Sequence, residues 1–95
     1  MAALTVIAKL KAKSGREEDL AALCRGLVAP TRAEAGCITY DLHRSHDDPG
    51  LFMFTESWES RPLWEDHMKS PHLTAFGEKQ DAVVETWDLF TGEKV

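Results

Sequence analysis

The sequence has little of what marks the more specialised classes of protein. It contains only two cysteines, Cys24 and Cys37, which are too few for a disulfide framework. No apolar run approaches the roughly 20 residues that cross a bilayer, and the first residues lack the charged and then apolar pattern of a signal peptide. We therefore expect a cytoplasmic protein with free thiols and no membrane partner.

Positive charge is scarce as well. The chain has 11 Lys and Arg residues against 16 Asp and Glu residues, for a formal net charge of −5, and the basic residues are scattered. A surface that follows a phosphate backbone needs clustered Lys and Arg, so we expect no nucleic-acid partner. The sequence also lacks a glycine-rich phosphate loop, a nucleophile elbow and a CxxC motif, which removes three common signatures of catalytic sites.

What is present is the composition of one small globular domain. Hydrophobic residues make up 43% and charged residues 28% of the 95 residues, close to the averages for folded domains. We expect a single domain over residues 1–95. A chain of this length buries only about 60–65% of its unfolded surface, so its leftover apolar faces would gain from a partner subunit.

The spacing of apolar residues predicts the order strand, helix, strand, strand, helix, strand, with the second helical region divided in two. Strict alternation of apolar and polar residues is typical of strands, and apolar residues three and four apart are typical of helices. The predicted strands cover residues 4–13, 37–44, 51–58 and 82–90. This order is that of an α+β, ferredoxin-like split βαβ fold, in which a four-stranded antiparallel sheet carries its helices on one face.

Local signals are expected to bound the helices. Ser14 and Glu17 have the spacing of a capping box at the start of the long helix. Pro30 should kink that helix because its amide is missing, and Gly36 should close it in the left-handed conformation. Ser60-Arg61-Pro62 opens the next helix, and Ser70-Pro71 repeats the signal for a last helix over residues 72–79.

Alternation assigns side chains to the two faces of each strand. Tyr40 is expected to share a face with Ile38 and Leu42, and Glu56 with neighbouring aromatic residues. The face of the sheet that no helix covers would expose a large apolar patch. We therefore predict a homodimer that packs sheet against sheet through this open face.

The stretch from Phe54 to His72 holds the strongest candidates for chemistry. Histidine titrates near neutral pH, so His67 and His72 could serve as a base and a polar anchor for a substrate, or one or both could be hydrogen-bonded packing residues. Trp58 and Trp64 could form a flat apolar wall for an aromatic ligand, or simply belong to the core.

Three further residues lie on faces that could reach a ligand. Glu56 shares its face with Phe54 and other aromatic residues, so a buried Glu56 needs a hydrogen-bond partner or a raised pKa. The alternative to a ligand contact is a purely structural role, in which the Glu56 carboxylate makes a buried hydrogen bond. The Tyr40 hydroxyl could contact a substrate or serve the core. A second polar cluster surrounds the predicted hairpin turn and is interpreted as solvated, so no metal site is predicted there; it consists of His43, His46, Asp47 and Asp48.

Three stretches resemble a known family. They are PTRAEAGCITYDL at 30–42, FTESW at 54–58 and HMKSPHLTAF at 67–76. Together they resemble the antibiotic biosynthesis monooxygenase (ABM) domain, which includes small quinol monooxygenases. The resemblance implies a dimeric α+β barrel with a ligand pocket inside each subunit. It also implies oxidation of phenols, quinols or anthrone-like rings by O2 with no metal, flavin or haem cofactor.

The motif residues implied by this resemblance are Trp58, His67 and His72, with Glu56 beside them. Relatives in the haem-degrading branch use a similar Trp and His together with an Asn on the first strand, and the first predicted strand here has no Asn. A bound haem stays open, because one histidine is sufficient as an axial ligand. Other relatives isomerise small sugar-derived phosphates or have no known activity.

The sequence therefore favours a cofactor-independent monooxygenase that oxidises a small aromatic quinol or phenol with O2. The hypothesis makes His67 or His72 the catalytic base. Two alternatives stay open, namely an isomerase or tautomerase that uses the same pocket and a non-catalytic dimer that binds small ligands. The predicted substrate-binding residues are Tyr40, Phe54, Glu56, Trp58 and Trp64.

Overall fold

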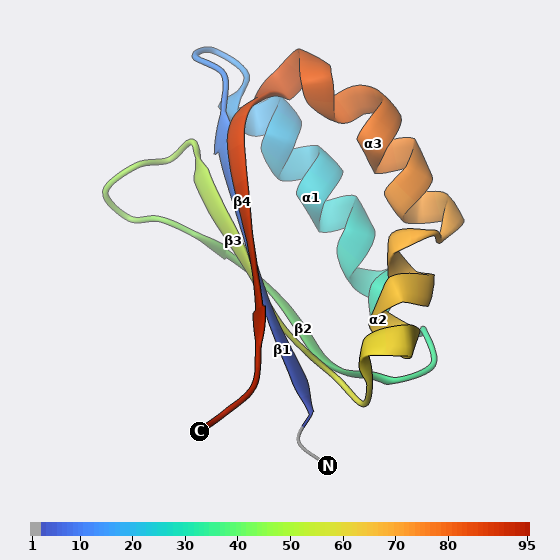
Figure 1. Ribbon diagram of the computed structural model, residues 1–95. Coiled ribbons are helices and arrows are strands. Elements are labelled where there is room, and N and C mark those ends of the chain that lie inside the picture. The colour runs from blue at the N-terminus through green and yellow to red at the C-terminus, as the bar shows by residue number, and fades with distance from the viewer. Residues whose placement is uncertain (1–2) are drawn as a thin grey trace.

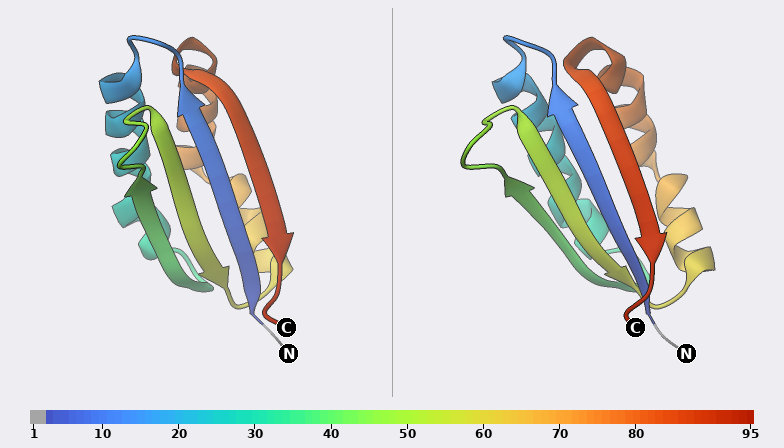
Figure 2. Two further views of the ribbon diagram at one scale, coloured as in Figure 1. Left: turned by 90° about the vertical axis from the view of Figure 1, so that its left-hand side faces the viewer. Right: turned by 60° about the vertical axis from the view of Figure 1, so that its left-hand side comes forward.

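The predicted ferredoxin-like fold is confirmed in the computed structural model, which describes residues 3–95. Its sheet has the strand order β2-β3-β1-β4 with every neighbouring pair antiparallel. All three helices lie on one face (Figure 1), and the opposite face is uncovered (Figure 2). In chain order the elements are β1 (Leu4–Ala12), α1 (Glu17–Arg32), β2 (Cys37–Arg44), β3 (Leu51–Trp58), α2 (Arg61–Met68), α3 (Pro71–Val83) and β4 (Val84–Gly92).

The core lies between the helices and the covered face of the sheet. Alternation along β3 is complete, because every second residue is buried and the others are half-buried. One stripe of α1 meets these strand side chains through Leu20, Cys24 and Leu27. Each such aliphatic or aromatic side chain contributes about 1.5–3 kcal/mol when fully buried. The helices over residues 3–95 are too short or too polar to cross a membrane.

The predicted capping box at the start of α1 is wrong. The N-cap residue is Arg16, and no side chain caps the helix there. A turn in which the Arg16 amide donates to the Lys13 carbonyl at 2.9 Å places Ser14 two residues before the N-cap. The Glu17 carboxylate accepts instead from the Gly15 amide at 3.3 Å.

The end of α1 also differs from its prediction. The helix continues through Pro30 and ends at Arg32, so Gly36 is not its cap. Gly36 nevertheless has a φ of +85°, a conformation that favours glycine. A Cβ atom at this position would lie 2.5 Å from Leu63 Cδ1 of α2. Gly36 thus permits the close approach of α2 to the loop that joins α1 to β2.

Two smaller predictions are corrected further along the chain. Ile38 does not share the buried face of Tyr40, because the register shifts between Cys37 and Thr39 and leaves Ile38 54% exposed. The last helix is longer than predicted, so β4 begins at Val84. The serine start signals are confirmed, since Ser60 and Ser70 each cap a helix through a hydrogen bond from the amide three residues later.

Candidate functional site

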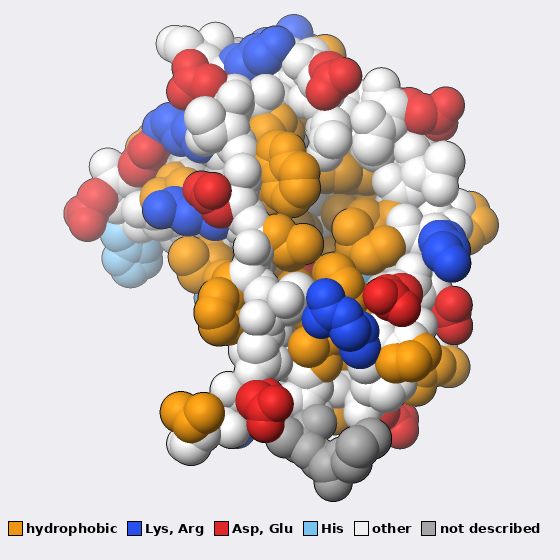
Figure 3. Space-filling model, in the orientation of Figure 1, with side chains coloured by type: hydrophobic (Ala, Val, Ile, Leu, Met, Phe, Trp, Pro, Cys, Tyr) orange, Lys and Arg blue, Asp and Glu red, His pale blue; other side chains and the backbone are white. Residues whose placement is uncertain are grey.

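A cavity of about 310 Å³ lies between the covered face of the sheet and the α2–α3 layer. Figure 3 shows hydrophobic side chains gathered between β4 and α3. The volume is at the lower end of the range for ligand pockets, about 300–1,000 Å³. No Lys or Arg is among the residues that line the cavity. Its polar side chains are Tyr40, Glu56, His67 and Gln80, and its walls include Leu10, Leu27, Phe54, Leu73, Phe76, Trp87 and Leu89.

His67 of α2 is the basic group at this cavity. Its side chain is 2% exposed, and its Nδ1 lies 2.6 Å from Oε2 of Glu34. Its ring lies 4.7 Å from the Trp58 ring and 5.6 Å from the Tyr40 ring, measured between centroids. Burial lowers the pKa of His67, although Glu34 opposes the shift. The imidazole is therefore neutral near neutral pH, with the Nδ1 proton donated to Glu34 and the Nε2 lone pair left for a ligand.

Glu34 comes from the loop between α1 and β2. Its backbone is fixed at both sides, because its amide donates to Thr31 at 3.0 Å and its carbonyl accepts from Cys37 at 3.3 Å. The same Oε2 atom that contacts His67 lies 2.9 Å from Nε2 of His72, which lies in the first turn of α3. One carboxylate oxygen thus joins two imidazoles from different helices.

Glu56 is the second titratable group at the cavity. It is 6% exposed, and its Oε1 accepts a hydrogen bond from Trp58 Nε1 at 2.9 Å. Burial raises the pKa of Glu56 to about 7, and the Glu34 charge adds to the rise while the Trp58 hydrogen bond opposes it. Near neutral pH Glu56 is therefore divided between its acid and its carboxylate, so it can donate or accept a proton.

Tyr40 is buried beside these groups. Its ring packs 4.9 Å from the Phe54 ring, and burial raises the pKa of its phenol. The hydroxyl therefore stays protonated at neutral pH, although a hydrogen bond with Thr31 opposes the rise in pKa.

The residues predicted from the sequence divide into two groups. Tyr40, Phe54, Glu56 and His67 line the cavity. Trp58, Trp64 and His72 do not line it. Trp58 is fully buried behind the His67 ring, and Trp64 packs under the Arg61 guanidinium, 5.4 Å from its ring centroid.

Sequence reasoning missed Glu34, the residue on which the two histidines converge. Glu34 lies in the PTRAEAG stretch that contributed to the family resemblance, but a loop carboxylate has no periodicity that would mark it. Gln80 and Trp87 at the cavity were also missed. Trp87 lines the cavity from β4, and nothing local in the sequence indicates that this face of the strand borders a cavity.

The Glu34, His67 and His72 cluster also has the composition of a metal site. The three ligand atoms lie within 4.8 Å of one another, and two nitrogens with one oxygen suit Zn²⁺. Ligand atoms around a tetrahedral Zn²⁺ stand about 3.3 Å apart, given bond lengths of about 2.0–2.1 Å. The separations of 2.6 and 2.9 Å are shorter. We therefore interpret the cluster as a hydrogen-bond network.

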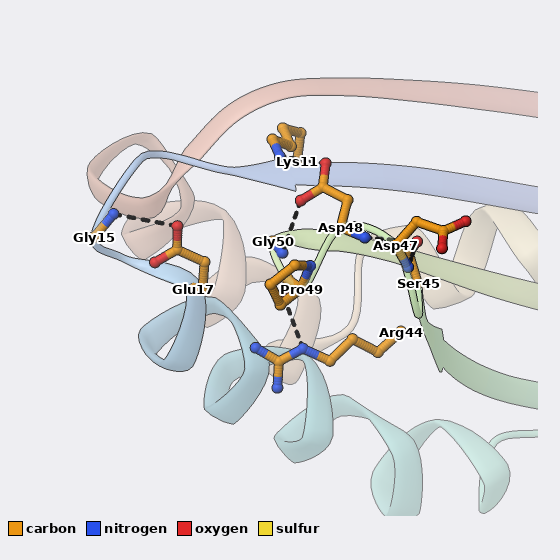
Figure 4. A network of polar contacts seen from close by, with 9 residues as sticks. All are labelled: Lys11, Gly15, Glu17, Arg44, Ser45, Asp47, Asp48, Pro49 and Gly50. Atoms are coloured by element: carbon orange, nitrogen blue, oxygen red, sulfur yellow. Dashed lines mark hydrogen bonds and ion pairs between the residues drawn. The ribbon is translucent and has the colours of Figure 1, made fainter.

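The hairpin turn contains no metal-ligand group among residues 3–95. Its polar side chains bind the turn itself (Figure 4). The Asp48 carboxylate accepts from the Gly50 amide at 3.1 Å and pairs with Lys11, while the Arg44 guanidinium donates to the Pro49 carbonyl at 2.7 Å.

Comparison with known proteins identifies relatives over most of the chain. Residues 3–79 match the family model described as "Antibiotic biosynthesis monooxygenase". The chain is 30% identical over 76 residues to the Synechocystis protein named "Uncharacterized protein sll1783", a match that covers 80% of this chain and 52% of that protein. The chain thus spans about half the length of that relative. It is 39% identical over 69 residues to the Mycobacterium tuberculosis protein named "Putative monooxygenase Rv0793", covering 73% of this chain and 67% of that protein.

Solved structures agree with this match. The crystal structure of PA3566 from Pseudomonas aeruginosa superimposes with a TM-score of 0.97 at 35% identity, covering 100% of this chain and 96% of that one. A second crystal structure, described as an antibiotic biosynthesis monooxygenase, gives a TM-score of 0.90 at 31% identity and covers 97% and 98% of the two chains.

Proposed function

Because this chain belongs to the antibiotic biosynthesis monooxygenase family, we propose that it is a cofactor-independent monooxygenase that oxidises a small aromatic quinol or phenol with O2. The observation that carries the proposal is His67, a buried neutral imidazole with Nδ1 held by Glu34 at 2.6 Å and Nε2 free at an apolar cavity. A general base in a water-poor pocket is what such a reaction requires of the protein.

The residues divide the work as follows. His67 Nε2 removes the hydroxyl proton of the substrate, and the resulting phenolate passes an electron to O2. The phenoxyl radical and superoxide then combine at a ring carbon to form a hydroperoxide. Loss of the ring C–H proton and cleavage of the O–O bond leave one oxygen on the ring as a quinone carbonyl and release the other as water. The Tyr40 hydroxyl donates a hydrogen bond to the phenolate or to the reduced oxygen. Glu56 returns a proton to the oxygen, because its pKa of about 7 keeps part of it protonated. Positioned acid–base groups of this kind contribute about 10²–10⁴-fold each.

The cavity favours an uncharged substrate. No cationic side chain lines it, so a phosphate or carboxylate group of a ligand would enter without a counter-charge, which is costly. Its apolar walls suit an aromatic ring, and its polar residues suit ring hydroxyls.

A second candidate function is isomerisation or tautomerisation in the same cavity. The presence of both His67 and Glu56 favours it, since one group can remove a proton and the other can return it. Such an enzyme would work without O2. Oxygenation and isomerisation thus differ in their need for O2, which can be measured.

We also propose that the protein is a homodimer through the uncovered face of the sheet. Ile7 of β1 pairs with Phe90 of β4 on that face, and Met53 of β3 lies beside them. Phe90 is 56% exposed. A partner sheet would remove this apolar surface from water.

The experiment that tests the activity is O2 uptake by metal-free protein with a panel of hydroquinones and anthrones, corrected for autoxidation. Saturable uptake is expected, and it should fall by at least about 100-fold in His67→Ala. His67→Asn is the sharper variant, because its amide keeps a donor near Nδ1 for Glu34 while removing Nε2. His46→Ala on the exposed hairpin turn is the control and should behave as wild type.

The outcomes separate the candidates. Unchanged uptake in both His67 variants would remove His67 from the base role. Anaerobic turnover of an enolisable substrate without O2 uptake would favour the isomerase. Saturable binding with no product under either condition would favour a ligand-binding protein.

A further inference from the structure

The hydrogen-bond link between His72 and the candidate base runs through another residue. It does not line the cavity, and its ring centroid lies 6.0 Å from that of His67. Its Nε2 lies 2.9 Å from Glu34 Oε2, the atom that also receives His67 Nδ1 at 2.6 Å. The two histidines are thus linked by one oxygen atom.

The chemistry of the carboxylate sets the direction of these hydrogen bonds. An ionised carboxylate only accepts, so both imidazoles donate to Glu34, His67 from Nδ1 and His72 from Nε2. Donation from Nδ1 leaves the lone pair of His67 on Nε2, the nitrogen that the proposed reaction needs. A change in the position of Glu34 would release this tautomer preference.

Glu34 needs a second contact to stay in place. Its side chain is 19% exposed, so it could turn toward water, where a carboxylate is well solvated. His72 lies on the outer side of the cluster with 21% of its side chain exposed. From the first turn of α3, His72 Nε2 contacts Oε2 of Glu34 and so holds the carboxylate in place.

We propose that His72 is a positioning residue that acts through Glu34 to keep the proton of His67 on Nδ1 and its lone pair on Nε2 in the cavity. The catalytic part of this inference rests on the proposed function, because it takes His67 as the base. The tautomer part does not, because it concerns the protein alone.

A packing role for His72 accounts less well for these contacts. The start of α3 is capped by Ser70, whose hydroxyl accepts from the Leu73 amide at 3.4 Å and also lies 3.2 Å from His72 Nε2. The contact of His72 Nε2 with Glu34 is the shorter of its two, at 2.9 Å. The His72 side chain is 21% exposed and does not belong to the buried core. Variants at this position should therefore keep the fold.

The test compares two variants at this position. His72→Gln keeps an N–H donor for Glu34, and His72→Leu has none. In His72→Leu, kcat should fall by about 10–100-fold, the usual effect of losing such a supporting contact. KM should stay within about twofold, because the residue lies outside the cavity. His72→Gln should regain most of the lost kcat.

A spectroscopic readout tests the tautomer without any turnover. In ¹⁵N-labelled protein, the His67 ring should show a protonated Nδ1 and an unprotonated Nε2 in the wild type and in His72→Gln. In His72→Leu the ring should show a mixture of both tautomers. This result stands or fails even if the protein is not a monooxygenase.

A double-mutant cycle tests whether His72 acts through Glu34. In a Glu34→Gln background, His72→Leu should produce no further change in kcat or in the His67 tautomer. Additive losses would overturn the proposal. So would a wild-type tautomer in His72→Leu, or equal losses in the Gln and Leu variants.

Discussion

Glu56 and Trp58 stand two residues apart on β3, so both side chains project to the covered face of the sheet. That spacing brings the indole N–H within 2.9 Å of the carboxylate. The same indole packs against the His67 ring. The sequence suggested that Trp58 could form a wall of the ligand pocket. In the structure Trp58 instead contacts two titratable side chains, Glu56 and His67, outside the cavity.

Replacement of Glu56 tests the effect of its burial on stability. The pKa of Glu56 is raised from 4.5 to about 7, so the folded protein holds a proton there that the unfolded chain has lost. The stabilisation that comes from this bound proton is fully present below pH 4.5 and disappears as pH rises through about 7. Relative to Glu56→Gln, wild type should lose up to about 3 kcal/mol of unfolding free energy over that interval, at 1.36 kcal/mol per pKa unit.

Urea denaturation at a series of pH values measures this difference. Glu59→Gln removes the same charge at an exposed position and is the matched control. Its stability should follow that of wild type across the interval. Parallel curves for wild type and Glu56→Gln would show that Glu56 ionises in the folded protein as it does in the unfolded chain.

At the scale of elements, the site depends on how closely α2 approaches the loop after α1. Gly36 has a φ of +85°, and its carbonyl accepts from the Glu59 amide at 2.8 Å. Leu63 of α2 packs where a side chain of residue 36 would lie. This contact joins the loop that carries Glu34 to the helix that carries His67.

Gly36→Ala should therefore destabilise the protein by about 2–5 kcal/mol, the sum of a left-handed alanine and an overpacked contact. Leu63 cannot swing away, because its Cβ would lie only 2.8 Å from the new methyl group. Urea denaturation is the measurement. Gly15→Ala is the control, since Gly15 has a φ of +84° but no atom within 4 Å of the added Cβ; it should lose only the backbone part, about 1–2 kcal/mol. Equal losses in the two variants would rule out the Leu63 contact as a source of strain.

At the scale of the whole molecule, the two faces of the sheet have different surroundings. Helices cover one face and leave the other uncovered (Figure 2). The strand registers place Ile7, Met53 and Phe90 on the uncovered face. β4 is an edge strand whose aromatic residues point to both sides, with Trp87 at the cavity and Phe90 on the open face. The proposed dimer would bury the open face, including Phe90.

Sedimentation should give a mass of twice the 10.6 kDa of one chain. Phe90→Lys should weaken the dimer by at least about 100-fold, because each subunit loses a buried aromatic side chain worth about 1.5–3 kcal/mol. Trp87→Lys places the same change on the opposite face of the strand at a similar exposure, 58% against 56%, and should remain dimeric. A monomeric wild type at micromolar concentration, or equal weakening in both variants, would contradict the open-face dimer.

The sequence by itself determined the order of the elements and most of their faces. Period-two alternation along β3 and the serine start signals of α2 and α3 are local properties, and each is set by backbone geometry over a few residues. The same local rules failed at Ser14 and Ile38, where a turn and a bulge changed the register by one or two residues. The prediction of a ferredoxin-like fold was unaffected by these errors, because the topology depends on the order of the elements and not on their exact boundaries.

Only the tertiary structure decided which polar groups meet. Glu34 is 33 residues from His67 and 38 from His72, so no short motif contains the cluster. The structure also placed Trp58 behind the site and His72 outside the cavity, although both lie in stretches that resemble the family. The physical reason is that periodicity encodes which face of an element is buried, whereas contact partners depend on how separate elements pack against one another.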